Sequence, residues 1–362
     1  MEAIRKATAG GLEGVMVAET RLSDVDGERG KLVVAGHDVE RLAGEATFEE
    51  AAALLWATDA ASARAGIAAG RARAFERLGH LGDALDREGG MDALRASVAH
   101  LEEAPGPGAS AAVTGAVATF AAAWARTRRG ERPIAPDPTL GHAADYLRMV
   151  TGQTPDAARA AGLDAYLVTV ADHGMNASTF AARVVASTGS DLISAVVAAI
   201  GALKGPLHGG APGPVLDMLD AIGAPDRAAA WIEGELVAGR RLMGMGHRIY
   251  RVRDPRAAVL ERATQQLQRA GISTGRLELA RAVERAAEGA LRQKHPDRPL
   301  RANVEFYTAV LLDTLGLDRR EFSPTFAVGR VAGWTAHVEE QRATGRLIRP
   351  ASTYVGPVPA EG

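Results

Sequence analysis

The sequence predicts an all-α protein, on three observations. Apolar residues recur three and four positions apart in long segments such as residues 276–293, "RLELARAVERAAEGALRQ". Typical helix-starting residues precede several apolar runs. Strand-like sequence is confined to one early segment, residues 14–36. We therefore expect more than a dozen helices and only a few short β pieces.

Within residues 14–36, the Asp26-Gly27 pair predicts a turn between short β pieces. The next element is a helix in "TFEEAAALLWATDA", residues 47–60. Thr47 is followed three positions later by Glu50, which is the pattern of a capping box and predicts that the helix begins just after Thr47.

Residues 104–125 form the longest uncharged stretch, which opens with Pro and Gly and continues mostly with Ala, Gly, Ser and Thr. This composition favours a buried small-residue helix over a membrane span. Residues 191–203 are apolar almost all round and predict a central buried helix. Farther on, Asp254 as N-cap, Pro255 at the first helical position and a stop near Gly271 predict another helix.

The composition excludes several classes of function. The 362 residues include 42 basic and 44 acidic side chains, and this balance argues against nucleic acid or an anionic membrane as main partner. The chain has no cysteine, which excludes disulfides, thiolate catalysis and cysteine-ligated metals. The first residues lack the apolar core of a signal peptide, so we expect a cytoplasmic protein.

One histidine lies in an unusual bend, "LKGPLHGGAP", residues 203–212. Glycines after His208 let the backbone approach a ligand, and a helix is expected to begin near Pro212 or Pro214. A histidine beside a helix N-terminus suits binding of an anion or a carbonyl. A loop histidine that merely caps a helix is the alternative.

Four other residues resemble His208 in being polar groups beside bends or apolar runs: His173, His247, Arg256 and Glu305. Singly, each has an ordinary structural explanation, such as a core histidine or a first-turn helix acid. Together they favour acid–base chemistry on a carbonyl, with arginines holding carboxylates. A His/His/Glu metal site is the alternative, but no HExxH helix is present and no two of these histidines share a helical turn.

Three segments resemble the signature segments of citrate synthases: "GPLHGGA", "GMGHRIYRVRDPRA" and "NVEFY". The resemblance extends over nearly the whole chain, including "ADHGMNASTFAARVVAST" in the middle and "FAVGRVAGWTAHVEEQ" near the end. The sequence is most similar to the short bacterial "citrate synthase 2" type, and 2-methylcitrate synthases are close.

The resemblance implies a citrate-synthase-like helical fold with the active site in a cleft that closes on oxaloacetate. Residues 1–208 and 317–362 would form the large domain, and residues 209–316 the small domain. The active unit would be a homodimer. Because the similarity begins at Gly11, the resemblance also implies no N-terminal extension of the kind that serves NADH regulation in hexameric members.

The family joins acetyl-CoA to oxaloacetate and hydrolyses the citryl thioester. By resemblance, Glu305 is the base that removes a methyl proton, and His208 donates a hydrogen bond to the thioester oxygen. That role requires a neutral His208, which we expect the helix N-terminus to favour. His247 polarises the ketone of oxaloacetate and protonates the new alkoxide.

The remaining roles implied by the resemblance concern binding. The residues expected to hold oxaloacetate are His173, Arg256, Arg330 and, reaching in from the partner subunit, Arg349. The residues expected to contact CoA are Leu242, Met243, Gly244, Met245 and Asn303. No cofactor beyond the substrate acetyl-CoA and no metal is expected.

Two departures from the family pattern are notable, since the family usually has Asp in place of Glu305 and Asn in place of Pro212. Both substitutions recur in the "citrate synthase 2" type. The sequence leaves open a 2-methylcitrate synthase that uses propionyl-CoA, because one methyl group is worth only about 1–3 kcal/mol of discrimination. A catalytically weak homologue that binds CoA or a dicarboxylate, and a metal-dependent hydrolase, are the alternatives from other classes.

Overall fold

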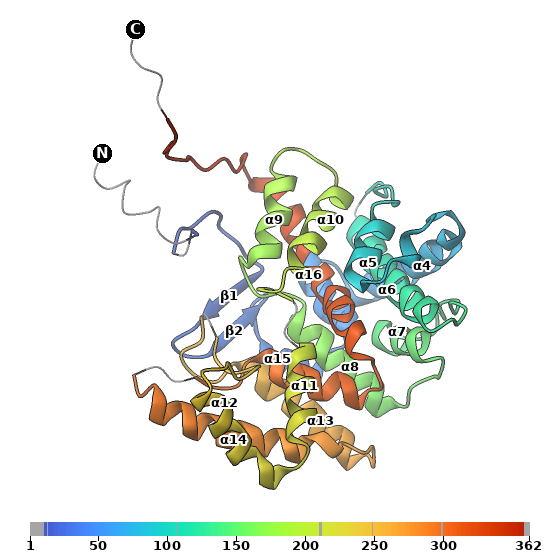
Figure 1. The fold of residues 1–362 in the computed structure, drawn as a ribbon. Helices are drawn as coiled ribbons and strands as arrows, with labels where there is room; N and C mark the ends of the chain where they lie inside the picture. Colours follow the sequence, from blue (N-terminus) through green and yellow to red (C-terminus); the bar gives the residue numbers. More distant parts are fainter. Residues whose placement is uncertain are drawn as a thin grey trace.

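The computed structural model describes residues 11, 12, 14–106, 108–209, 212–247, 249–297 and 300–357. Within these ranges it contains fifteen α-helices and one small three-stranded sheet, which confirms the all-α prediction (Figure 1). The first ten residues, used to predict that a signal peptide and an N-terminal extension are absent, lie outside these ranges. Gly210 and Ala211 of the predicted bend also lie outside them.

The sheet is antiparallel and lies in the predicted early segment. Its strands are β1 (Ser23–Asp26), β2 (Lys31–Val34) and β3 (His37–Asp38). Asp26 of β1 pairs with Lys31 of β2, so the turn comprises residues 27–30 and begins at the predicted Asp26-Gly27 pair.

The helices follow in chain order. The first nine are α2 (Val39–Glu45), α3 (Phe48–Trp56), α4 (Ala60–Glu76), α5 (Gly90–Val98), α6 (Ala109–Arg128), α7 (His142–Thr151), α8 (Ala157–Val170), α9 (Ala177–Ala186) and α10 (Leu192–Leu203). The other six are α11 (Pro212–Ile222), α12 (Ala228–Val237), α13 (Pro255–Arg269), α14 (Gly275–Lys294), α15 (Val304–Thr314) and α16 (Phe322–Thr344). Short 3₁₀ turns are η1 (Leu78–His80), η2 (Ala84–Asp86), η3 (Pro225–Arg227) and η4 (Arg319–Glu321).

The local start and stop signals act as predicted, with one correction. Thr47 and Glu50 form the capping box of α3. The helix ends at Trp56, however, and does not continue to residue 60. Ala57 adopts a left-handed conformation with φ of 52°, and Asp59 then caps α4 by accepting from Ser62 N. The segment therefore contains α3 and only the first residue of α4.

The small-residue helix α6 is almost wholly buried, as predicted, and packs against α4. A Cβ added at Gly115 would lie 2.2 Å from the Ile67 carbonyl oxygen, so the close approach of the two helices requires glycine there. In the described ranges, no helix is both long and apolar enough to cross a membrane.

Helix α16 runs through the middle of the molecule and packs against α8, α9 and α10 (Figure 1). Two glycines one turn apart permit this packing. A Cβ at Gly329 would meet the Leu167 carbonyl oxygen at 2.9 Å, and one at Gly333 would meet the Ala171 carbonyl oxygen at 2.2 Å. One face of α16 therefore packs in close backbone contact with the end of α8 and with the turn that follows it.

Helices α11, α12, α14 and α15 pack among themselves on the lower side of the molecule in Figure 1. Helix α13 joins this group to the rest, because it packs against α15 on one side and against α2 and α8 on the other. Asp254 and Pro255 begin α13, and Gly271 follows its end with φ of 80°, as predicted.

Candidate active site

The fold brings six of the predicted site residues to one region, although they come from five separate parts of the chain. The segments that meet there are the turn after α8, the bend after α10, the loop before α13 with the first turn of that helix, the start of α15 and the middle of α16. The six residues are His173, His208, His247, Arg256, Glu305 and Arg330.

His173 lies in the turn after α8 and is almost fully buried. Its Nε2 atom is 3.0 Å from the Tyr250 hydroxyl, and its ring centroid is 5.9 Å from that of His247. Burial, together with the charges of Arg256 and Arg330, lowers the pKa of His173 well below its usual value. The ring is therefore neutral at physiological pH.

His247 has a defined tautomer. Its Nδ1 atom accepts hydrogen bonds from the backbone N–H groups of Ile249 and Tyr250, at 3.0 and 3.1 Å. Burial and the charge of Arg256 lower the pKa of His247 to about 4, so the neutral ring carries its hydrogen on Nε2. That Nε2 lies 3.2 Å from Arg256 Nη2, which is also a donor. An oxygen atom of a ligand at this point would accept from both.

Arg256 is fixed by the carboxylate of Asp254. Its Nε and Nη2 atoms donate to Asp254 at 3.0 and 2.8 Å, in a bidentate pair that is almost fully buried. The same carboxylate accepts from Val304 N at 3.0 Å. Asp254, which the sequence suggested only as a helix cap, therefore joins α13 to α15 and orients the arginine.

Glu305 lies in the first turn of α15, whose N-cap is Asn303. The Oε2 atom of Glu305 is buried and has no hydrogen-bond partner among the described residues. Burial raises the pKa of Glu305 to about 7, although the charge of Arg256 opposes the shift. A buried carboxylate with this pKa is suited to take up a proton near neutral pH.

His208 is held from behind by Ser178. Its Nε2 atom is 2.8 Å from Ser178 Oγ, which also accepts the indole N–H of Trp334 at 3.0 Å. Burial, followed by the charge of Arg330, lowers the pKa of His208 to about 4. The ring is thus neutral, as expected; burial and Arg330 lower its pKa, and the contribution of the helix N-terminus that the sequence suggested stays a prediction.

Arg330 is buried in the middle of α16, and its Nε atom donates to the Val170 carbonyl. No described residue accepts a hydrogen bond from its two terminal nitrogens. Burial lowers the pKa of Arg330 to about 10, and the carboxylate of Asp172 partly offsets the shift. The guanidinium is therefore charged and free to bind an anion.

The predicted CoA segment is clamped to the start of α15. Gly246 N donates to Arg301 O at 2.7 Å, and Asn303 N donates to Gly244 O at 2.9 Å. The Asn303 amide donates to Gly246 O at 2.8 Å while its oxygen caps α15. Gly244 has φ of 73°, and a Cβ there would lie 2.9 Å from Phe306 Cβ. Both hydrogen-bonding groups of the Asn303 side chain are thus engaged within the protein, where they hold the loop of His247 against the helix of Glu305.

A cavity of about 540 Å³ opens beside this clamp. Leu242, Met245 and His247 line one part of it. Four cationic or titratable residues line another part: Arg240, Arg241, Lys294 and His295.

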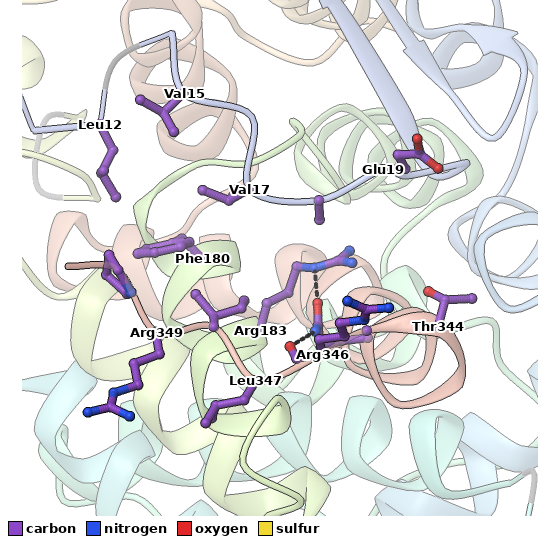
Figure 2. A pocket seen from close by; sticks show the side chains of 15 residues that line it. Leu12, Val15, Val17, Glu19, Phe180, Arg183, Thr344, Arg346, Leu347 and Arg349 are labelled. Carbon is purple, nitrogen blue, oxygen red and sulfur yellow. Dashed lines mark hydrogen bonds between the residues drawn. The ribbon is translucent and has the colours of Figure 1, made fainter. Parts of the chain in front are cut away.

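Arg349 is not brought to the site within one chain. It is exposed on the C-terminal tail, beside a groove of about 480 Å³ between that tail and the N-terminal segment (Figure 2). In the described ranges, no three His, Asp or Glu residues are grouped so that they could hold a metal ion.

Sequence reasoning missed Tyr250, Ser178 and Trp334. Tyr250 lies within the motif of His247, and Ser178 lies two positions after Asn176. Trp334 is four positions after Arg330, so the two share a helix face. The signal that could have found them is this spacing, combined with polar groups that a buried site must satisfy.

Comparisons with known proteins match nearly the whole chain. The family model for citrate synthase, C-terminal domain, matches residues 11–351. A putative citrate synthase 2 from Mycobacterium tuberculosis is 38% identical, covering 96% of this chain and 93% of that protein. A 2-methylcitrate synthase from the same species is 37% identical, covering 96% and 90%.

Two solved structures are also similar. Citrate synthase from Thermotoga maritima superposes with a TM-score of 0.84 at 35% identity, covering 97% of this chain and 96% of that one. The citrate synthase of Thermoplasma acidophilum, in ternary complex with carboxymethyl coenzyme A and oxaloacetate, gives 0.85 at 26% identity, covering 98% of each chain.

Proposed function

Since this chain belongs to the citrate synthase family, we propose that it condenses acetyl-CoA with oxaloacetate and hydrolyses the product to citrate and free CoA. One observation carries the proposal. Glu305, whose Oε2 atom is buried and unpartnered and whose pKa is raised to about 7, lies in the same site as two donors, His247 Nε2 and Arg256 Nη2, that converge on one point. A base and a carbonyl-binding pair are what this reaction needs.

Oxaloacetate would place its ketone oxygen between His247 Nε2 and Arg256 Nη2. Its carboxylates would then bind the guanidinium groups of Arg256 and Arg330 and the ring of His173. Buried arginines suit this task, because charge-assisted hydrogen bonds are stronger where water is excluded. The free terminal nitrogens of Arg330 support the assignment.

Glu305 would remove a proton from the methyl group of acetyl-CoA, leaving an enolate whose oxygen accepts a hydrogen bond from His208. For this, His208 must carry its hydrogen on Nδ1, so Nε2 must accept from Ser178. The Trp334 indole can only donate, so it occupies a lone pair of Ser178 Oγ and leaves the hydroxyl hydrogen for His208 Nε2 or for Asn176 Oδ1. Asn176 Oδ1 already accepts two backbone N–H groups, which supports donation to His208.

The enolate carbon would then attack the ketone carbon of oxaloacetate, forming the new C–C bond as the ketone π electrons become an alkoxide. His247 Nε2–H would deliver the proton to that alkoxide. The two backbone N–H donors on Nδ1 stabilise the electron pair that the ring gains as it gives up this proton. Water would finally cleave the thioester, releasing citrate and the CoA thiol. No step requires a cofactor or a metal ion.

The CoA moiety would occupy the cavity of about 540 Å³ beside Leu242 and Met245. Its phosphates would lie toward the arginines and lysine that line the cavity. Residues 209–316 would form the smaller domain and close on oxaloacetate, so that water is excluded until condensation is complete. The enzyme would act in the cytoplasm.

The direct test is a thiol-release assay with the purified protein, oxaloacetate and either acetyl-CoA or propionyl-CoA. We expect CoA release that depends on oxaloacetate and is faster with acetyl-CoA. Faster release with propionyl-CoA would instead make the protein a 2-methylcitrate synthase, the activity in the name of one relative at 37% identity. Binding of CoA without any thiol release would indicate a sensor.

The active unit would be a homodimer in which Arg349 completes the oxaloacetate site of the partner subunit. Its exposed place on the C-terminal tail, away from the other site residues of its own chain, supports this assignment. Mixing inactive Arg349→Ala chains with inactive His247→Ala chains should restore activity, because a hybrid dimer keeps one intact site. Absence of recovery despite proven subunit exchange would contradict it.

A further inference from the structure

Three polar residues follow one another along a single face of α16. Arg330, Trp334 and His337 are spaced by four and three positions, which places them on the same side of the helix. Arg330 enters the site directly, and Trp334 contacts His208 through Ser178. His337 is fully buried and has no role in the reaction proposed above.

The contacts of His337 determine which of its nitrogens carries hydrogen. Arg183 Nη1 lies 2.9 Å from His337 Nδ1, and a guanidinium can only donate, so Nδ1 accepts. The hydrogen of the ring is then on Nε2, which lies 3.2 and 3.3 Å from the two carboxylate oxygens of Asp172. His337 therefore donates to Asp172, the residue directly before His173.

Asp172 is also bound by a residue of the small sheet. Ser23 in β1 donates its hydroxyl hydrogen to Asp172 Oδ2 at 2.5 Å and accepts the backbone N–H of Gly174 at 2.9 Å. Ser23 and His337 together hold the residues on both sides of His173. The imidazole of His173 is thus positioned by contacts to its two chain neighbours.

Arg183, which contacts His337, is itself buried and has further partners. Arg183 also donates to Gln341 Oε1 at 2.9 Å and to Glu340 Oε2 at 2.7 Å. Arg183 lies at the groove beside the C-terminal tail (Figure 2), and Gln341, which accepts from Arg183, donates in turn to the Arg346 carbonyl at 3.1 Å. Gly333, whose added Cβ would lie 2.9 Å from Asp172 Oδ1, lets α16 approach this closely.

We propose that His337 is a positioning residue for oxaloacetate binding, which acts through Asp172 on His173. This inference rests on the proposed function, because it takes His173 as an oxaloacetate ligand. The His337–Asp172 bond keeps the turn at residues 172–174 in the geometry that presents the His173 ring to the substrate. Loss of the bond weakens oxaloacetate binding and leaves binding of the acyl-CoA substrate unchanged.

The test compares two substitutions of one residue. In His337→Gln, the amide oxygen can accept from Arg183 and the amide N–H can donate to Asp172, so both bonds are retained. In His337→Leu both are lost. We expect KM for oxaloacetate to rise about 10-fold in the leucine variant, which corresponds to one lost buried hydrogen bond. It should stay within about threefold of wild type in the glutamine variant, with KM for acetyl-CoA unchanged in both.

Thr335→Val is the matched control, because Thr335 is fully buried on the same helix but bonds to Trp56 and Ala332, away from the site. It should lower thermal stability without changing KM for oxaloacetate. If His337→Leu does not fold, Ser23→Ala decides the question, since it removes the other bond to Asp172 and should raise KM for oxaloacetate alone.

The proposal is overturned if folded His337→Leu keeps the wild-type KM for oxaloacetate, if both KM values rise equally, or if His337→Gln behaves like His337→Leu. It is overturned in the same way if Ser23→Ala, used in its place, leaves KM for oxaloacetate unchanged. Failure of the proposed function is recognised separately, because wild-type protein would then release no thiol from acetyl-CoA and oxaloacetate.

Discussion

Two carboxylates of this protein, the buried Asp145 in α7 and the half-buried Glu305 in α15, have opposite surroundings. Asp145 accepts hydrogen bonds or ion pairs from Arg71 at 2.8 Å, from Arg148 at 2.7 Å and from the backbone of Asp137 at 3.1 Å. Glu305 Oε2 is equally removed from solvent, yet no described residue donates to it. The nearby Arg256 is already bound to Asp254.

This contrast shows that burial of charge alone does not identify a reaction centre. A buried carboxylate that is fully paired holds helices together, because its desolvation is offset by its partners. A buried carboxylate without partners is costly to ionise, and burial accordingly raises the pKa of Glu305 to about 7. The missing partner, and not the burial, distinguishes a group that is available for proton transfer.

The largest expected effect is on stability, and it should come from replacing Asp145, the carboxylate that has partners. Asp145→Asn would remove the main counter-charge of the buried Arg71 guanidinium, and loss of a partner in a buried pair typically costs about 3–5 kcal/mol. We expect that loss in the free energy of unfolding, measured in urea at fixed protein concentration, with little change in kcat for the protein that remains folded. Asp83→Asn is the control, because the exposed Arg87–Asp83 pair should contribute less than about 1 kcal/mol. Equal losses in the two variants would contradict the structural role of Asp145.

Glu305→Gln should have the opposite effect, with a large loss of activity and no loss of stability. The amide keeps the shape of the side chain but cannot take up a proton, so kcat should fall at least about 100-fold. The free energy of unfolding should be unchanged or higher, because the amide has no charge to desolvate. The measurements are steady-state thiol release and urea unfolding. A glutamine variant that keeps most of its activity would show that Glu305 is not the base.

The pH dependence of kcat/KM tests the raised pKa of Glu305. Glu305 is active as a base only when ionised, so kcat/KM should rise with pH and level off above about 7. Between pH 7.5 and 5.5 the decrease should be roughly 25-fold, from the fraction of a group with a pKa of about 7 that is ionised. His208 and His247, whose pKa values are lowered to about 4, stay neutral throughout. The residual activity of Glu305→Gln should lack this rise, and a wild-type profile flat from pH 5.5 to 7.5 would contradict the raised pKa.

Part of the fold and of the candidate site could be predicted from the sequence. Caps and turns are local, so Thr47, Asp254 and the Asp26-Gly27 turn were placed correctly. The gathering of His173, His247 and Arg256 was predicted from motif resemblance, and contacts join these three.

What was missed depends on contacts between distant segments. Ser178 contacts His208, 30 positions later in the chain, and Trp334, 156 positions later. Asp172 is held by residues 149 and 165 positions away. None of these separations leaves a periodic signal in the sequence. The end of α3 was missed because Ala57, which carries no turn signal, adopts a left-handed conformation.

The smallest expected effect comes from shortening the side chain of Glu305. Glu305→Asp keeps the charge but withdraws the carboxylate by about 1.5 Å, one C–C bond. Intrinsic basicity hardly changes, since the two residues differ by about 0.4 pKa units in model peptides. Position therefore decides the outcome, and a misplacement of about 1 Å can cost up to 100-fold.

The Asn303 cap and the clamp to Gly244 and Gly246 fix the backbone of Glu305, so the shorter side chain cannot be brought forward by moving the helix. We expect kcat to fall about 10-fold, less than for the glutamine variant, because a base is still present. A second substitution, Asn303→Ser, tests this reasoning. It keeps the helix cap but removes the tie to Gly246, so it should recover part of the rate lost by the aspartate variant. An aspartate variant faster than wild type would show that the length of Glu305 is not fitted to this site, and that its reaction differs from the one proposed.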